Sequence, residues 1–313
     1  MGRATRSSFG EALARLGRKH KNLVVLDADL AKSTMTVDFQ KEFPDRHFEF
    51  GIAEQNMIGA AAGLALCGKT AVATSFACFL VGRLETIRVA VAYNRADVKL
   101  VGTHAGIGIG EDGASQMGLE DLGAMRSLPH VTILQPADDR ETQQAVEWMI
   151  TYPGPVYIRL TRQKMDDVHA RDYVFKVGVA DTLFEPRRGG APLQATIFAS
   201  GGTVGEALAA ARELERQGTA VRVVNAATIA PFDGGAVAAA AAESGRIVTV
   251  EDHNVIGGLG SAVSEALAEQ GAACPVVRLG VRDFGESADG AELYRKHGLS
   301  SEHIAQACLR GLA

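Results

Sequence analysis

The chain has 313 residues, of which 47% are hydrophobic and 22% are charged, and its formal net charge is -5. This length is enough for two domains of ordinary size, and the negative charge disfavours nucleic acid or an anionic membrane as a partner. No apolar run reaches the roughly 18 residues of a membrane-spanning helix, and the N-terminal residues lack the apolar core of a signal peptide.

The four cysteines are Cys67, Cys78, Cys274 and Cys308, and their spacing fits neither a metal site nor a redox motif. We therefore expect reduced thiols, mostly in apolar surroundings, and a cytoplasmic protein.

The first half of the chain alternates between helical and strand patterns. Residues 8–17 form an amphipathic helical pattern with Phe9, Leu13 and Leu16 on one face. An Arg- and Ala-rich helix is expected after Phe79, up to about residue 94, and another helix opens after Pro136. The expected strands are 23–26, 69–75, 98–102, 131–134 and 155–160. This order is typical of an open parallel sheet, whose ligands lie at the carboxyl ends of the strands.

From about residue 164 to 192 the pattern loosens into charged, Gly and Pro residues. Strands are again expected at 195–199, 220–225, 246–251 and 276–279, with helices at 205–217, 235–244 and 260–269. The sequence thus predicts two consecutive α/β domains, residues 1–170 and 192–313, joined by a linker at 171–191.

Three glycine clusters stand out. Residues 201–205 and 257–260 each follow a strand and open a helix, but neither completes a dinucleotide-binding motif, so we interpret both as tight turns. Gly106, Gly108 and Gly110 alternate along a loop, which favours a close approach of backbone to a ligand.

Six polar residues follow predicted strands of the first domain, and together they indicate a cleft at one end of its sheet. Arginine and histidine suit a phosphate, and the remaining side chains suit hydroxyls, so the implied ligand is a sugar phosphate. The residues are Asp29, Ser33, His104, Asp112, Gln116 and Arg162.

Residues 47–57 suggest a short strand, a glycine turn and a helix start, with Glu54 just inside that start. The following helix contains Gly59 and Gly63, each costing roughly 1 kcal/mol relative to alanine, which a sequence accepts where another backbone approaches closely. Taken alone, Glu54 could simply suit the positive N-terminus of a helix.

Three separated motifs resemble the C-terminal half of a transketolase. They are the stretch from His104 through Gly-Glu-Asp-Gly-Ala-Ser-Gln to residue 122, Gly51-Ile-Ala-Glu-Gln-Asn-Met, and Thr249-Val-Glu-Asp-His. The resemblance covers nearly the whole chain. It implies a pyrimidine-binding domain followed by a transketolase C-terminal domain, and the transfer of a two-carbon ketol unit from a ketose phosphate to an aldose in carbohydrate metabolism, such as the pentose phosphate pathway.

The resemblance also implies roles for individual residues. Glu54 is the carboxylate that meets the aminopyrimidine ring of thiamine diphosphate, and burial must make its neutral form accessible. Phe76 and Phe79 pack on that ring, and Asp29 belongs to the cofactor and substrate cleft. Asp112 holds a donor hydroxyl. The sugar-phosphate contacts are Arg6, Ser33, His104 and Arg162.

Two positions depart from the family pattern. Gln116 stands where bacterial, yeast and plant transketolases generally carry His, although animal-type enzymes carry Gln in a similar setting. We still expect Gln116 to be a catalytic residue, but its side chain cannot transfer a proton. Gly82 stands where the family often has a larger residue, so the resemblance leaves the shape of the pocket open.

The family binds the divalent cation of thiamine diphosphate through a Gly-Asp-Gly motif followed by an Asn, and this chain lacks that motif. We expect one subunit of a split transketolase that holds no metal itself. A partner subunit would supply the diphosphate domain and Mg²⁺, and two copies of each chain would form a heterotetramer.

The sequence is also compatible with two alternatives. The β subunit of a thiamine-diphosphate-dependent 2-oxoacid dehydrogenase has the same two-domain plan, but His104, Asp112 and Arg162 argue against it. A non-catalytic regulatory homologue is the other alternative, and Glu54 argues against it because nothing else requires an acid there.

Overall fold

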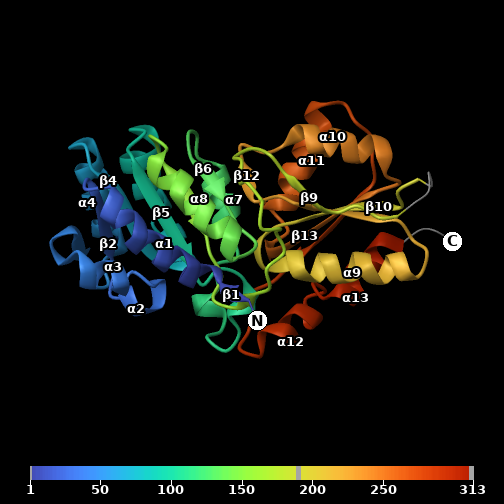
Figure 1. The fold of residues 1–313 in the computed structure, drawn as a ribbon, viewed down its shortest axis with the longest axis horizontal. Helices are drawn as coiled ribbons and strands as arrows, with labels where there is room; N and C mark the ends of the chain where they lie inside the picture. The colour runs from blue at the N-terminus through green and yellow to red at the C-terminus, as the bar shows by residue number, and fades with distance from the viewer. Residues whose placement is uncertain (1, 188–191, 310–313) are drawn as a thin grey trace.

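The computed structural model describes residues 2–187 and 192–309. Two α/β bodies lie side by side, each a sheet with helices on both faces (Figure 1). The C-terminal end of the expected linker, 188–191, and residues 310–313 of the expected second domain lie outside the described part. The N-terminal segment lies between the two bodies (Figure 1).

Within the described residues the first sheet has seven strands in the order β12-β6-β7-β5-β4-β2-β3, and all neighbours are parallel except β12 with β6. These strands are β2 (Leu23–Asp27), β3 (His47–Glu49), β4 (Thr70–Phe76), β5 (Val98–Thr103), β6 (Thr132–Leu134), β7 (Val156–Arg159) and β12 (Thr228–Ala230). Strands β2, β4, β5, β6 and β7 are buried along their whole length, as expected for a parallel sheet covered on both faces.

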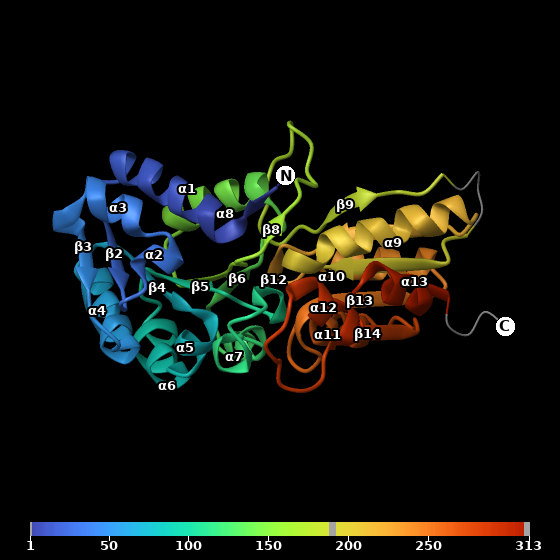
Figure 2. The ribbon, with the colours of Figure 1, turned by 90° about the horizontal axis from the view of Figure 1, so that it is seen from below.

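Helices cover both faces of this sheet. Figure 2 shows α1, α3 and α8 above the sheet, and α4, α5, α6 and α7 below it. Their bounds are α1 (Thr5–Lys19), α2 (Ala31–Thr34), α3 (Val37–Glu42), α4 (Glu54–Leu66), α5 (Ala77–Val81), α6 (Leu84–Thr86), α7 (Asp121–Arg126) and α8 (Asp139–Thr151). The helix expected after Pro136 begins because the Asp138 carboxylate accepts the N–H of Glu141 at 2.9 Å and caps α8.

The helix expected from after Phe79 to about residue 94 is helical over residues 84–93, but the expectation of one unbroken α-helix is wrong. Helix α5 ends before Gly82, α6 is one short turn, and a π-helical stretch, η2 (Ile87–Tyr93), follows. Gly82 is exposed and ends α5, because glycine favours helix termini over helix interiors.

The second sheet has the order β14-β13-β10-β11-β9, with β9 antiparallel to its neighbour. Its strands are β9 (Asp181–Phe184), β10 (Ala195–Ala199), β11 (Val221–Asn225), β13 (Ile247–Asn254) and β14 (Val276–Val281). The helices are α9 (Val204–Arg216), α10 (Gly234–Glu243), α11 (Leu259–Glu269), α12 (Gly290–Lys296) and α13 (Ser301–Leu309). Strand β9 lies inside the expected linker, although the boundaries themselves stay a prediction.

Two short pairings were absent from the sequence prediction, and the first of them connects the two bodies. Strand β12 comes from the second half of the chain but joins the edge of the first sheet beside β6. Strand β1 (Arg3–Ala4) pairs antiparallel with β8 (Lys164–Met165), so the N-terminus is fixed beside the end of β7.

The cysteines are all free. Cys308 is buried, and Cys78 and Cys274 are partly buried. Cys67 is exposed, against the expectation of a core thiol, because α4 ends at the surface just before it.

Candidate functional site

The turn after β2 is fixed by the fully buried Asp27. Its carboxylate accepts hydrogen bonds at 2.7–3.0 Å from the N–H of Leu30 and the hydroxyls of Thr34, Thr36 and Thr74. This satisfies a buried charge and fixes the segment that carries Asp29 and Ser33. The sequence prediction singled out the two neighbours and missed the residue that holds them.

Glu49, also missed, joins this turn to the one before Glu54. Its Oε1 accepts the N–H of Asp29 at 2.6 Å and the N–H of Gly51 at 2.9 Å. Asp29 and Gly51 both have left-handed φ angles, 61° and 63°, and the Asp29 side chain is exposed. One carboxylate at the sheet edge therefore holds both turns.

His104 follows β5 and is buried, with a φ of 54°. Arg6 Nη1 lies 2.9 Å from Nε2, and since a guanidinium only donates, Nε2 accepts and Nδ1–H donates to Thr103 Oγ1 at 2.9 Å. Burial, and then the charges of Arg6 and Arg162, lower the pKa of His104 to about 3. The imidazole is therefore neutral near pH 7.

Arg6 lies here because the N-terminal segment runs beside the end of β7. The Arg6 N–H donates to Thr161 O at 3.3 Å, and Nη1 also donates to Ser33 O at 2.8 Å. Burial and the nearby Arg162 charge lower the pKa of Arg6. Its Nε is buried without a hydrogen-bond partner among the described residues.

Arg162 is half-exposed and lies 2.8 Å from Asp112 Oδ1, with a weaker bond of 3.3 Å to Ile109 O. The structure thus brings together five of the predicted site residues: Arg6, Ser33, His104, Asp112 and Arg162.

An aromatic stack adjoins this group. The Phe76 and His104 rings are stacked with centroids 3.7 Å apart, and the Phe76 and Phe79 rings are stacked at 5.5 Å. Gln116 makes weaker contacts. Its backbone carbonyl accepts from Cys78 Sγ at 3.3 Å, and its side chain donates to Ser115 Oγ at 3.5 Å.

Glu54 occupies a separate hollow of about 470 Å³ at the start of α4. Its side chain is 5% exposed, and Arg83 Nη2 lies 3.7 Å from Oε2. The sequence prediction missed Arg83, because the break at Gly82 that turns it toward α4 was not expected. At Gly82 an added Cβ would meet only ordinary contacts at 3.5 Å, so the fold does not require glycine there.

The outer side of α4 is open. Asn56, Gly59, Gly63 and Leu66 are exposed, and an added Cβ at either glycine would meet no atom within 4 Å. Nothing in the described chain therefore supplies the close backbone approach that these glycines predicted.

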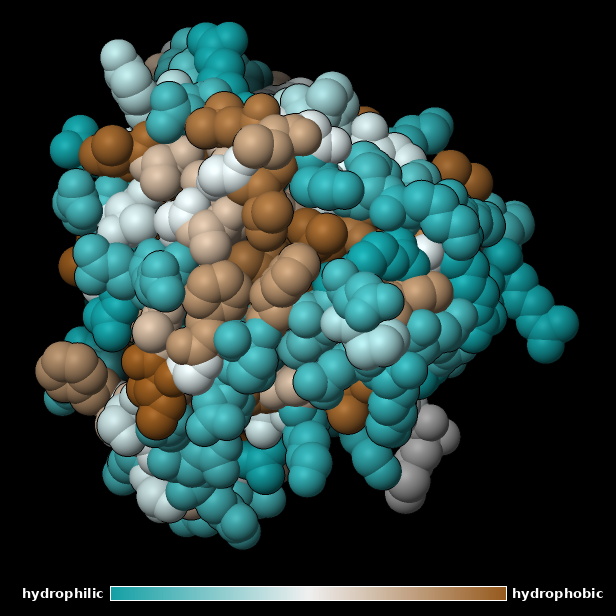
Figure 3. Space-filling model, turned by 90° about the vertical axis from the view of Figure 1, so that its left-hand side faces the viewer, coloured by the Kyte–Doolittle hydropathy of each residue, from teal (hydrophilic) through white to brown (hydrophobic). Residues whose placement is uncertain are grey.

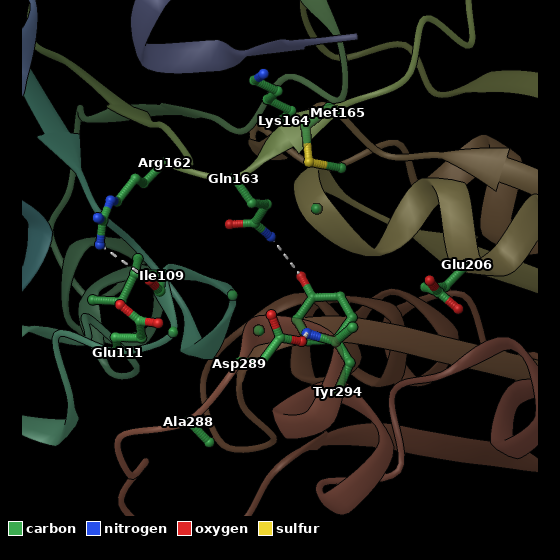
Figure 4. Close-up of a pocket in the computed structure, with 15 residues that line it drawn as sticks. Ile109, Glu111, Arg162, Gln163, Lys164, Met165, Glu206, Ala288, Asp289 and Tyr294 are labelled. Atoms are coloured by element: carbon green, nitrogen blue, oxygen red, sulfur yellow. Dashed lines mark hydrogen bonds between the residues drawn. The ribbon is translucent and has the colours of Figure 1, made fainter. Parts of the chain in front are cut away.

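A further hollow of about 430 Å³ lies between the two bodies. Figure 4 shows Arg162, Gln163, Lys164 and Met165 on one side and Asp289 and Tyr294 from the second body on the other. Within residues 2–187 and 192–309 there is no group of three or more His, Cys, Asp or Glu side chains that could hold a metal ion. In the same residues no helix is long and apolar enough to cross a membrane.

Comparisons with known proteins agree over both halves of the chain. Residues 1–167 match the model of the transketolase pyrimidine binding domain, and residues 192–304 match that of the transketolase C-terminal domain. A protein of Methanocaldococcus jannaschii, whose name describes a transketolase C-terminal section, is 43% identical over 305 residues, which cover 96% of this chain and 94% of that protein.

Other relatives differ in length. An apulose-4-phosphate transketolase subunit of Phocaeicola vulgatus is 38% identical, with 98% of this chain and 96% of the relative covered. Human transketolase is 39% identical over 99% of this chain, which spans only 49% of the human protein. A solved structure described as a split gene transketolase, inactive beta4 tetramer, matches with a TM-score of 0.88 and 42% identity, covering 100% of this chain and 99% of that one.

These matches cover the chain almost from end to end, and they agree on one family in both halves. The chain belongs to the transketolase family and carries its pyrimidine-binding and C-terminal domains.

Proposed function

We propose that this chain is the C-terminal subunit of a split transketolase, which transfers a two-carbon ketol unit between sugars that carry an anionic group. The observation that supports this proposal most is the convergence of Arg6 and Arg162 beside a neutral His104. The Arg162 charge lowers the pKa of Arg6, and an anion bound between the two guanidinium groups would offset this repulsion.

The arginines have donors available for such an anion. Arg6 Nε is buried and unpartnered within the described chain, and Arg162 is bound on one side by Asp112 and remains half-exposed on the other. A planar guanidinium pair suits the oxygens of a phosphate. In this arrangement His104 accepts a hydrogen bond from Arg6 and so orients the Arg6 guanidinium. The arginines, rather than His104, would donate hydrogen bonds to the anion.

Thiamine diphosphate fits the remaining residues. When bound, it supplies the nucleophilic carbon and stores the electron pair while a carbon–carbon bond breaks. Glu54 offers a nearly buried carboxylate for a pyrimidine nitrogen, with Arg83 as its charged neighbour, and Phe76 with Phe79 offers a stacked apolar wall. Asp112 and Gln116 would contact substrate hydroxyls.

We infer that a partner subunit covers the α4 face and carries the diphosphate and Mg²⁺ ligands. Figure 3 shows apolar residues gathered on the end of the molecule that α4 occupies. Ile52, Leu66 and Tyr93 are 87%, 67% and 82% exposed. An exposed apolar surface of this kind fits a protein interface.

The proposed substrates belong to one chemical class, sugars that carry an anionic group. The names of two relatives mention apulose-4-phosphate and 6-deoxy-6-sulfo-D-fructose, so the anion bound by the arginines here could be a phosphate or a sulfonate. A place in the pentose phosphate pathway and a heterotetramer are parts of the proposal that follow from the family resemblance. A cytoplasmic location is a part that follows from the expected reduced cysteines.

The decisive experiment is reconstitution with the co-purified partner from the native host. The mixture, with Mg²⁺ and thiamine diphosphate, is assayed for ketol transfer between sugar phosphates and, in parallel, for oxidation of 2-oxoacids. Ketol transfer supports the proposal. Oxidation of 2-oxoacids alone would identify a dehydrogenase β subunit, and inactivity with a tightly bound, cofactor-loaded partner would identify a regulatory subunit.

A further inference from the structure

The Glu251-Asp252-His253 stretch lies on β13 in the second body, yet Asp252 binds a loop of the first. The Asp252 side chain is buried among both bodies. Its Oδ1 accepts the N–H of Ile107 at 2.7 Å, and its Oδ2 accepts the N–H of Gly108 at 3.1 Å and the hydroxyl of Tyr294 at 2.9 Å. The carboxylate is therefore saturated by groups that anchor one loop.

The alternating glycines of that loop follow from these contacts. A Cβ at Gly106, whose φ is 85°, would lie 2.1 Å from Asp252 Oδ2. A Cβ at Gly108 would lie 2.2 Å from Gln163 Nε2. Gln163 Nε2 in turn donates to the Tyr294 hydroxyl at 2.9 Å (Figure 4), so the loop is held between Asp252 and Gln163.

The far end of the loop carries the sugar-binding groups. Its stem is closed by the Gly106 N–H donating to Gly118 O at 2.9 Å. Beyond the glycines, Ile109 O and Asp112 Oδ1 both contact Arg162. Displacement of the loop would therefore move Asp112 and release Arg162 together.

We propose that Asp252, together with Tyr294 and Gln163, is a positioning residue: the second body fixes residues 106–110 so that Asp112 and Arg162 meet the sugar. The kinetic part of this proposal rests on the proposed function. Burial raises the pKa of Asp252, whereas Arg159 and the N–H groups of Ile107 and Gly108 favour its charged form.

A matched control lies one residue away. Glu251 is also fully buried, and its carboxylate accepts two N–H groups, from Leu259 at 2.7 Å and Gly260 at 2.8 Å. Those contacts stay within the second body and hold the start of α11. Asp252→Asn and Glu251→Gln each replace one of two acceptor oxygens by a donor, but only the first variant affects the loop.

Hydrogen exchange on the full chain tests the anchoring without any activity assay. In Asp252→Asn we expect the amides of Ile107 and Gly108 to exchange at least about tenfold faster than in the unsubstituted chain, with no such change in Glu251→Gln. If Asp252→Asn does not fold, Tyr294→Phe serves instead, because it removes only the hydroxyl. Unchanged protection of both amides in the folded variant would overturn the proposal.

Kinetics of the reconstituted enzyme tests the positioning. We expect Asp252→Asn to raise the KM for the anionic sugar donor about tenfold with a smaller change in kcat, and Glu251→Gln to leave both near their original values. A KM that stays unchanged while the loop amides exchange faster would also overturn it. Failure of the proposed function would appear instead as the absence of ketol transfer in the unsubstituted assembly.

Discussion

Glu54 is the only acid in the hollow at the start of α4 among the residues that line it, and Arg83 is the charged group beside it. Glu54→Gln keeps the shape of the side chain but removes the acid. We expect the variant to fold and assemble normally and to lose about 10²–10⁴-fold in kcat, the range for a positioned acid or base. Turnover of the reconstituted enzyme is the measurement, and Glu85→Gln on the neighbouring α6 is the control. Near-normal turnover of Glu54→Gln would remove Glu54 from the chemistry.

Arg162 tests the anion site. Its half-exposed guanidinium contacts Asp112 and lies close enough to Arg6 to lower the pKa of Arg6. A hydrogen bond to a charged group contributes about 1.5–3 kcal/mol, so Arg162→Ala should raise the KM for phosphorylated or sulfonated sugars at least about tenfold. The KM for uncharged sugars should change far less. Lys164→Ala, an exposed cation two residues away, should change neither, and equal effects of Arg162→Ala on both sugar types would place Arg162 outside the anion site.

Among the elements, helix α4 contains exposed glycines that no packing contact within the described chain explains. Gly63 is exposed with no atom near a Cβ position, and so is Gly205 near the start of α9. Each Gly→Ala change should stabilise the isolated chain by up to about 1 kcal/mol. Only Gly63→Ala should weaken association with the partner, because only α4 lies in the proposed interface.

Thermal unfolding of the isolated chain and titration with the partner measure the two effects separately. Partner affinity that is the same for Gly63→Ala and Gly205→Ala would place the interface elsewhere on the molecule.

The elements that could be predicted from the sequence are those that a run of consecutive residues indicates by itself. Strand β2 opens with four consecutive apolar residues, and α8 begins with a capping aspartate. Strands β9 and β12 were missed because each is short, antiparallel and at a sheet edge. Such strands are defined mainly by pairing with a distant strand, and their own residues show little pattern.

The site shows the same division. His104 and Arg162 follow predicted strands, and the polarity of strand ends was enough to group them, whereas Arg6 was expected only from the family resemblance. Arg83 and Asp252 act through contacts with distant segments, and no local pattern marks such a contact. The Thr249–His253 motif was recognised as part of the family pattern. Its contact with the glycine loop could not be predicted, because that contact depends on how the two domains pack.

At the scale of the whole molecule, a buried polar cluster joins the two bodies around His169. Its Nδ1 lies 2.9 Å from Asp138 of α8, and its Nε2 lies 3.3 Å from Asn225 of β11, 3.6 Å from Glu141 and 3.8 Å from Asp181 of β9. Tyr173 also donates to Glu141, at 2.6 Å. Burial would lower the pKa of His169, but the bond to Asp138 and the charges of Glu141 and Asp181 raise it.

A raised pKa gives the stability a defined pH dependence. The protonated His169 contributes fully below its unfolded pKa of about 6.5, and its contribution is lost as the pH rises through the higher folded value. We expect His169→Gln to lower the free energy of unfolding by about 1–3 kcal/mol near pH 6, and by less as the pH rises. Denaturant unfolding from pH 5.5 to 9 measures this, with His130→Gln, an exposed histidine, as control. A deficit that is constant with pH would show that His169 does not titrate in the cluster.

In the proposed assembly this chain holds the pyrimidine and the sugar but leaves the diphosphate to a partner. Calorimetric titration of the purified chain with thiamine diphosphate and Mg²⁺, alone and after saturation with the partner, tests this arrangement most directly. We expect no tight binding to the chain alone, because the charged diphosphate needs metal ligands, and tight binding to the assembly. Micromolar binding to the chain without any partner would contradict this account.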